Sequence, residues 1–151
     1  MKYQLAQINV AKMLAPLESD RMAAFVAALD PINELADQSP GFIWRLQEDG
    51  GNATTIRIFD DDMLLVNMSV WDSLESLRDF VYLSNHAEIM RDRRKWFKKM
   101  AIVHLALWWV PAGHRPTEAE AQARLERLRS EGPTNFAFTF GQPFDVESGS
   151  R

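Results

Sequence analysis

Apolar and polar residues alternate in several short stretches of this chain, which is the pattern of a β-strand that buries one face. In the first stretch, Ala6, Ile8 and Val10 alternate with Gln7 and Asn9. This alternation, together with the length and flanks of one long apolar run, predicts strands over residues 3–10, 42–47, 54–59, 64–71, 102–110 and 136–140.

Helical spacing, with apolar residues three or four positions apart, separates these strands. We expect a first helix from about Ser19, as its cap, to Ala36. Pro31, which follows Asp30, removes a backbone donor, so we expect a kink or a fresh start of the helix there.

Two later helices have recognisable caps. Asp72 or Ser73 caps a helix that follows the strand over 64–71. Thr117 followed by Glu120 is a capping-box pattern that begins another helix. We predict that Ala121, Leu125 and Leu128 form the buried stripe of this helix. We predict that the helix ends at Gly132 and Pro133.

The segment from residue 80 to residue 100 combines aromatic residues, a histidine and a basic run, and its spacing from Asn85 onward predicts a helix. Six cations lie between Arg91 and Lys99 beside the carboxylate of Asp92, in a chain whose formal net charge is -4. Two interpretations stay open: a helix with a solvated basic face, or a site that binds an anion.

The predicted order of strand, helix, strands, helix and strand resembles a split βαβ unit, which is the ferredoxin-like arrangement. We therefore predict an α+β fold in which helices cover one face of an antiparallel sheet, with an extra C-terminal helix and strand. One domain over residues 1–145 and a frayed tail over 146–151 account for the chain. The other face also needs cover, so we expect a homodimer.

The two faces of the predicted sheet differ in polarity. We assign to the face under the helices Ala6, Ile8, Val10, Phe42, Trp44, Leu46, Val66, Met68, Val70, Val103, Leu105, Leu107 and Trp109. The opposite face receives Gln7, Asn9, Arg45, Gln47, Asn67, Ser69 and His104, together with Trp71 and Trp108. Large apolar side chains combined with a few polar ones favour a ligand pocket or a dimer interface with a pocket beside it. Plain solvent exposure is the alternative.

Composition removes several classes of function. The chain has no cysteine, which excludes disulfides, thiolate catalysis and cysteine-bound metals. Its acidic balance, with a pI of about 5.4, argues against nucleic-acid binding. We see no signal peptide and no apolar run that spans a bilayer, so we expect a cytoplasmic protein that does not contact membranes. The sequence contains no metal-ligand spacing, no nucleophile elbow and no glycine-rich dinucleotide loop.

Several long segments of the chain are similar to a known family. They are LAQINVA, FVAALDPINELADQSPGFIWRLQ, LVNMSVW, FVYLSNHAEIMRDRRKWF, LWWVPAGHRPTEAEAQARLERL and AFTF. Together they resemble the domain-of-unknown-function family 3291. That family is similar to the dimeric α/β-barrel proteins, a group that includes antibiotic-biosynthesis and haem-degrading monooxygenases. The resemblance implies a dimeric α/β barrel.

The haem-degrading members of that group resemble this chain only in part. They share an asparagine on the first strand, a tryptophan on the helix after the third strand and a histidine beyond it. Asn9 and His86 stand in the corresponding regions here, but Phe80 takes the place of the tryptophan and the spacing to His86 differs. This departure argues against haem degradation and leaves haem, or another flat aromatic anion, as a candidate ligand.

Two functions from different classes follow from these residues. The first is a monooxygenase-like enzyme, needing no cofactor, in which His86, Asn9 and Asn67 polarise or deprotonate a small aromatic substrate. The second is a non-catalytic protein that binds haem or another aromatic carboxylate, with His86 as candidate iron ligand and arginines pairing with the carboxylates. The predicted ligand-binding residues are Arg45, Ser69, Trp71, Phe80, Tyr82, Met90, Arg93, Arg94, His104 and Trp108.

Overall fold

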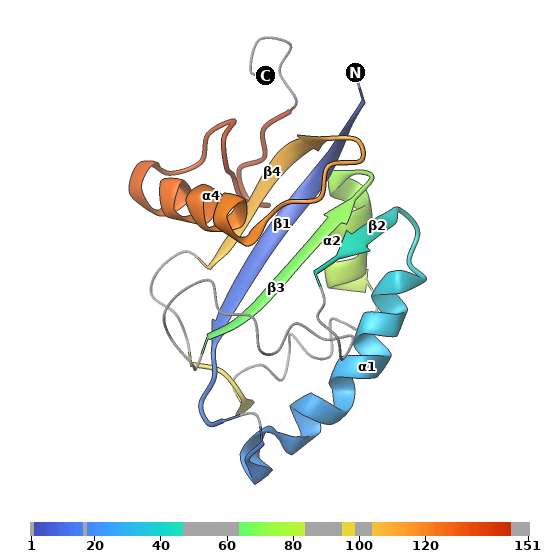
Figure 1. Cartoon of the computed structure of the whole chain (residues 1–151), viewed down its shortest axis with the longest axis vertical. Helices are drawn as coiled ribbons and strands as arrows, with labels where there is room; N and C mark the ends of the chain where they lie inside the picture. Colours follow the sequence, from blue (N-terminus) through green and yellow to red (C-terminus); the bar gives the residue numbers. More distant parts are fainter. Residues whose placement is uncertain (1, 17, 47–63, 84–94, 99–103, 146–151) are drawn as a thin grey trace.

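An antiparallel sheet forms the centre of the part of the chain that the computed structural model describes, residues 2–16, 18–46, 64–83, 95–98 and 104–145 (Figure 1). Its strands are β1 (Tyr3–Lys12), β2 (Phe42–Arg45), β3 (Leu64–Trp71) and β4 (Leu105–Pro111), in the order β2-β3-β1-β4. The helices are η1 (Asp20–Met22), α1 (Ala23–Asp37), α2 (Leu74–Leu83) and α4 (Glu118–Glu131). This topology confirms the predicted ferredoxin-like α+β fold.

The alternation of apolar and polar residues located most strands correctly. β3 covers the predicted residues, and β1 continues beyond the predicted end to Lys12. The predicted strand over 136–140 is wrong as a strand, because only Phe138 pairs with β4, through an isolated bridge to Leu107. The predicted strand over 54–59 lies outside the described residues.

The first helix differs from its prediction at both marked positions. Ser19 does not cap it, because its hydroxyl donates to the carbonyl of Pro16 at 2.6 Å, and α1 begins later. Pro31 lies inside a continuous α1, so the expected fresh start is wrong. Pro31 and Ala27 are both exposed, so water can satisfy the carbonyl that the proline leaves without a donor.

The helix predicted over residues 85–100 is wrong at residues 95–98, and residues 84–94 lie outside the described part of the chain. Phe97 forms an antiparallel bridge with Met13, and the amide of Leu14 donates to the carbonyl of Trp96 at 2.7 Å. Trp96 is buried against Met13 and the start of the α1 region, including Phe25. Burial of this ring and pairing with the end of β1 outweigh the helical spacing.

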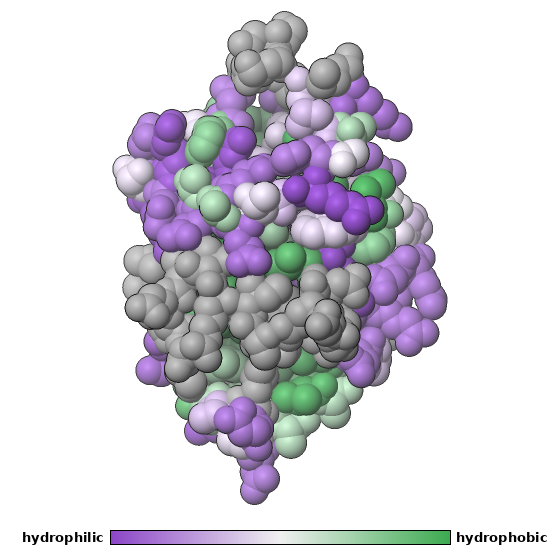
Figure 2. Space-filling model, in the orientation of Figure 1, coloured by the Kyte–Doolittle hydropathy of each residue, from purple (hydrophilic) through white to green (hydrophobic). Residues whose placement is uncertain are grey.

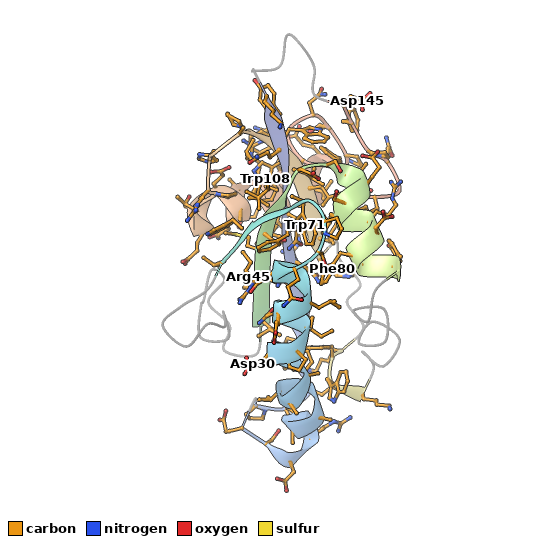
Figure 3. The ribbon with its side chains drawn as sticks, turned by 90° about the vertical axis from the view of Figure 1, so that its right-hand side faces the viewer. Asp30, Arg45, Trp71, Phe80, Trp108 and Asp145 are labelled. Atoms are coloured by element: carbon orange, nitrogen blue, oxygen red, sulfur yellow. The ribbon has the colours of Figure 1, made fainter. Side chains whose placement is uncertain are left out.

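The sheet separates two hydrophobic cores. On one face, the buried stripe of α4 packs against β1, β3 and β4. On the other face, α1, α2 and the C-terminal segment pack on Leu5, Trp71 and Leu107. Figure 3 shows α4 and α2 on opposite sides of the strands. The chain itself therefore supplies cover to both faces, and the predicted homodimer stays a prediction.

The polar residues lie on the other face from the one we expected. Gln7 and Ser69 share their face with Leu5 and Trp71, which are packed under α1 and α2. The alternation grouped the residues of β1 and β3 correctly, but it could not indicate which group turns toward which helices. That choice depends on the direction in which the connections leave the sheet.

The assignment of β4 to its faces was also wrong. Leu107 is opposite Gln7 and Trp108 is opposite Ala6, so Trp108 belongs to the face that α4 covers. His104 lies on the same face, since it continues this register opposite Val10. Both faces of β4 are apolar, and its alternation therefore carries no information about the register.

α4 confirms the predicted capping box and buried stripe. The hydroxyl of Thr117 accepts a hydrogen bond from the amide of Glu120 at 3.1 Å, and Gly132, with φ of 80°, ends the helix. The carboxylate of Glu120 also accepts from the Trp108 indole at 3.0 Å and contacts His114 Nε2 at 2.7 Å. Figure 2 shows mainly hydrophilic residues on the outer side of α4.

These contacts shift the pKa of Glu120. Burial raises the pKa, but the hydrogen bonds from His114 and Trp108 and the charges of His114 and Arg124 together lower it below its ordinary value of 4.5. Glu120 thus holds the start of α4 against β4 as a carboxylate.

Among the described helices, none is long and apolar enough to cross a membrane. The expected cytoplasmic location stays a prediction.

We predict that Glu120→Gln lowers the free energy of unfolding at pH 7 by about 1 kcal/mol, because it replaces a charged acceptor of hydrogen bonds by a neutral amide. A carboxylate with a lowered pKa stabilises the fold above its unfolded pKa, and this contribution is lost as the pH falls through the lowered value. The difference between the two proteins should therefore shrink from pH 7 to about pH 4 in urea unfolding followed by tryptophan fluorescence.

Glu131→Gln is the matched control on the same helix. Glu131 pairs with Arg127 at 3.0 Å, but both side chains are about half exposed, so the loss should be only a few tenths of a kcal/mol. Equal losses in the two variants would contradict the role assigned to Glu120.

Candidate functional site

Strand pairing brings five polar residues together on the face under α1 and α2. Across one row of the sheet, Arg45 is opposite Ser69, and Ser69 is opposite Gln7. In the neighbouring row, Asn67 is opposite Asn9. We call these residues the polar strip. The strip crosses three adjacent strands, so residues far apart in sequence become neighbours.

Gln7 is the centre of the strip and is almost fully buried. Its side-chain Nε2 donates to Oδ1 of Asn67 at 2.6 Å and to Oγ of Ser69 at 2.9 Å. Both amide hydrogens of Gln7 are therefore used within the sheet. The oxygen of the Asn67 amide is turned toward Gln7, which leaves the Asn67 nitrogen as the donor for other partners.

Ser69 connects the strip to the aromatic part of the same face. Its buried hydroxyl oxygen accepts from the Trp71 indole nitrogen at 2.8 Å as well as from Gln7. With two donors on this oxygen, only the hydroxyl proton is left to interact elsewhere. The Trp71 ring packs edge-on against Phe42, with centroids 5.4 Å apart, and beside Phe80 at 5.2 Å. Figure 3 shows Trp71 and Phe80 on the side of α2, away from Trp108.

Arg45 closes one end of the strip with an ion pair. Its Nε donates to Oδ1 of Asp37 at 2.8 Å and its Nη2 to Oδ2 at 3.3 Å, a two-point contact with the last residue of α1. Asp37 is more exposed than Arg45, with side-chain exposures of 43% and 13%. The positive charge of Arg45 is therefore already balanced within the chain.

Asn9 has a buried oxygen whose hydrogen bonding is unsatisfied. Its Oδ1 is shielded from solvent and has no hydrogen-bond partner within the described part of the chain. The same part holds one other such atom, Nδ2 of Asn135. A buried acceptor without a donor costs about 1–3 kcal/mol, so a ligand that supplies a donor beside Asn9 gains that free energy.

The structure brings together only some of the predicted site residues. Asn9, Asn67, Arg45, Ser69 and Trp71 share one face, and Phe80 packs on Trp71. Three other predicted residues lie elsewhere: Trp108 and His104 are on the face of α4, and the exposed Tyr82 contacts Phe140, while their role as ligand-binding residues stays a prediction. His86, Met90, Arg93 and Arg94 lie outside the described residues.

Sequence reasoning placed Gln7 on the polar face but did not select it as a site residue. The sequence feature that could have selected Gln7 is its position two residues before Asn9, on a strand with apolar neighbours.

For metal binding, the described ranges contain no group of three or more histidine, aspartate or glutamate side chains arranged to hold an ion.

Comparisons with known proteins give a family and several distant structures. Residues 4–151 match the family model described as "Domain of unknown function (DUF3291)", which confirms the predicted family. No curated protein matches. PA3566 from Pseudomonas aeruginosa is 12% identical, with a TM-score of 0.48 over 73% of this chain and 94% of that chain.

Two further solved structures are similar at the same level. A putative antibiotic biosynthesis monooxygenase from Nitrosomonas europaea is 14% identical, with a TM-score of 0.47 over 73% of this chain and 88% of that chain. SnoaB, a cofactor-independent oxygenase from Streptomyces nogalater, is 15% identical, with a TM-score of 0.45 over 74% of this chain and 95% of that chain.

We predict that Gln7→Glu lowers the free energy of unfolding by about 3 kcal/mol at pH 8, because it buries a carboxylate facing the oxygens of Asn67 and Ser69. Burial raises the pKa of the introduced carboxyl, so the loss is present above that raised pKa and is relieved as the pH falls below it. Urea unfolding at pH 8 and at about pH 5 measures this recovery.

Gln4→Glu makes the same change on the same strand. The Gln4 oxygen accepts from the amide of Gly113 at 3.3 Å in an exposed position, and a carboxylate retains that acceptor. Its stability should change by less than about 0.5 kcal/mol, with no recovery at the lower pH. A Gln7→Glu protein as stable as this control would show that Gln7 is not the buried donor described above.

Proposed function

The chain belongs to the DUF3291 family, and we propose that it is a monooxygenase-type enzyme that binds a small aromatic hydroxy compound at the polar strip. The observation that carries this proposal is the buried Oδ1 of Asn9, which has no partner within the described part of the chain. A phenol carries a hydroxyl that can donate one hydrogen bond to Asn9. Its flat apolar ring can pack against the apolar residues around Asn9.

The neighbours of Asn9 suit such a ligand. Leu105 lies opposite Asn9 on β4, and Leu107 lies opposite Gln7, which gives the ring apolar surface on the side away from β3. The Asn67 nitrogen, left over because Gln7 holds the oxygen of that amide, is a donor for a second oxygen on the ligand. The strip thus distinguishes aromatic rings by the donors and acceptors that they carry.

The reaction that we propose takes all its electrons from the substrate. A phenol and O₂ give a quinone and water: one oxygen atom forms a C–O bond on the ring, the O–O bond breaks, and the second atom leaves with the two hydrogens that the phenol loses. The phenol loses four electrons and O₂ gains four, so no further reductant is needed. An electron-rich phenolate starts this reaction more readily than the neutral phenol.

A base is required to form the phenolate. In this proposal the side chains of Asn9 and Asn67 orient the hydroxyl, but amides do not accept its proton near neutral pH. We propose His86 as that base, on its sequence position after α2. The described strip then orients the substrate, and the proton transfer takes place at His86.

Binding of an aromatic carboxylate is served less well by the described residues. Arg45 is the cation of the strip, and its two-point contact with Asp37 already balances its charge. A carboxylate ligand at this position would have to replace Asp37. For this reason the proposal favours a neutral hydroxy compound over haem or another carboxylate.

We predict that the protein binds 1-naphthol about tenfold more tightly than 1-methoxynaphthalene, because only the naphthol donates a hydrogen bond to Asn9. Asn9→Leu should remove this preference, as measured by quenching of tryptophan fluorescence. Asn135→Leu is the control, since Asn135 carries the other unsatisfied amide atom of the described chain. Retention of the preference in Asn9→Leu would contradict the assignment of Asn9.

Oxygen uptake with phenols and quinols, in the presence of a chelator, tests the reaction itself. With 1-naphthol we expect one O₂ consumed per 1,4-naphthoquinone formed, and a loss of kcat of at least about 100-fold in His86→Ala. Binding without oxygen uptake would contradict the enzymatic proposal and favour a non-catalytic binding protein. A Soret shift of added hemin that His86→Ala abolishes would favour haem ligation instead.

A further inference from the structure

Gln7 controls which hydrogen-bonding group the Asn67 side chain offers to a ligand. Nε2 of Gln7 donates to Oδ1 of Asn67 at 2.6 Å and to Oγ of Ser69 at 2.9 Å. A planar amide carries its acceptor and its donors on different sides, so an Asn67 oxygen held by Gln7 leaves the Asn67 nitrogen for other partners. Gln7 is 5% exposed whereas Asn67 is exposed, so a ligand can reach Asn67 from solvent but not Gln7.

Trp71 lies at the other end of this chain of hydrogen bonds. Its indole nitrogen donates to Oγ of Ser69 at 2.8 Å, beside the bond from Gln7 to the same oxygen. If the amides of Gln7 and Asn67 were both turned over, the Gln7 oxygen would face Ser69, and the Asn67 oxygen would be left for the ligand. The orientation of one buried residue therefore decides whether Asn67 offers a donor or an acceptor.

Asn9 supplies the second half of a recognition pair. It is directly opposite Asn67, and its buried Oδ1 has no partner within the described residues. The Cβ atoms of directly opposite residues lie about 4.5–5.5 Å apart, so the two side chains can reach neighbouring atoms of one ligand. With Gln7 in its described orientation, the pair consists of an acceptor from Asn9 and a donor from Asn67. Its complement is a ligand with a donor and an acceptor side by side.

We propose that Gln7 sets the specificity of the polar strip, which selects aromatic hydroxy compounds that carry a hydrogen-bond acceptor beside the hydroxyl. This inference rests on the proposed function, since it uses the same ligand position. The hydroxyl donates to Asn9, and the neighbouring acceptor takes a hydrogen from Asn67. Gln7 is a positioning residue, because it acts on the ligand only through Asn67.

The pair of 1-naphthol and 8-hydroxyquinoline tests this specificity. The two molecules have the same shape, but 8-hydroxyquinoline has a ring nitrogen in place of a C–H group beside the hydroxyl, and near neutral pH both are uncharged. In titration calorimetry, with a chelator present, we expect the protein to bind 8-hydroxyquinoline about tenfold more tightly than 1-naphthol, because it makes one additional hydrogen bond.

Two substitutions test the roles of the two amides. Asn67→Asp keeps the oxygen that Gln7 holds and replaces the nitrogen by an oxygen, so 1-naphthol should now bind more tightly than 8-hydroxyquinoline. Gln7→Leu removes the hold on the Asn67 amide, so the preference for 8-hydroxyquinoline should fall below about threefold. Gln4→Leu is the control on the same strand. The Gln4 side chain bonds the amide of Gly113 in an exposed position, and its loss should leave the preference unchanged.

Nuclear magnetic resonance tests the orientation of Gln7 without a ligand. Because Gln7 and Trp71 donate to the same oxygen of Ser69, their two bonding hydrogens lie about 3 Å apart. We expect a strong nuclear Overhauser effect between a side-chain amide hydrogen of Gln7 and the indole N–H hydrogen of Trp71. Its absence from the unaltered protein would place the Gln7 oxygen toward Ser69 and overturn the proposal.

The specificity set by Gln7 and the ligand position itself can fail separately. The preference for 1-naphthol over 1-methoxynaphthalene depends on Asn9 and tests the ligand position. If that preference is found but the protein binds 8-hydroxyquinoline no more tightly than 1-naphthol, or if Gln7→Leu keeps the full preference, the role of Gln7 is overturned while the ligand position stands. If both preferences are absent, the ligand position fails, and the role of Gln7 fails with it.

Discussion

The simultaneous pairing of β1 with β3 and β4 is the constraint on which the rest of the structure depends. It sets Gln7 between Ser69 and Leu107, and it sets Asn9 between Asn67 and Leu105. A shift of one residue in either pairing would exchange the two faces of that strand. The polar strip and the apolar residues beside it therefore exist only in this register.

The buried polar network adds a second constraint. Gln7 uses both of its amide hydrogens, and the oxygen of Ser69 accepts from Gln7 and from Trp71. These bonds couple the orientations of the Gln7 and Asn67 amides, because turning one of them alone sets two oxygens or two NH2 groups against each other. Against this fixed background, the unsatisfied oxygen of Asn9 stands out as the place where a ligand would complete the hydrogen bonding.

The two sides of the sheet have different roles. The side of α4 is a continuous apolar core, held at its margin by Glu120, which bonds both Trp108 and His114. The side of α1 and α2 carries the polar strip, and its apolar end is covered by Phe138, Phe140 and Phe144 of the C-terminal segment. The candidate site thus shares its face with a hydrophobic core that contains Leu5, Trp71 and Leu107, so substitutions in the strip also affect stability.

The sequence by itself determined the strands β1 and β3, the capping box of α4 and the grouping of Asn9, Asn67, Arg45 and Ser69, because each depends on local spacing. Tertiary structure alone decided the register of β4, because both faces of this strand are apolar and its sequence does not distinguish them. The register in turn decided on which face Trp108 and His104 lie. It also decided that residues 95–98 pair with β1 instead of forming a helix, since the burial of Trp96 has no local signal. Local patterns fix which residues share a face, but only the packing of distant segments decides what that face meets.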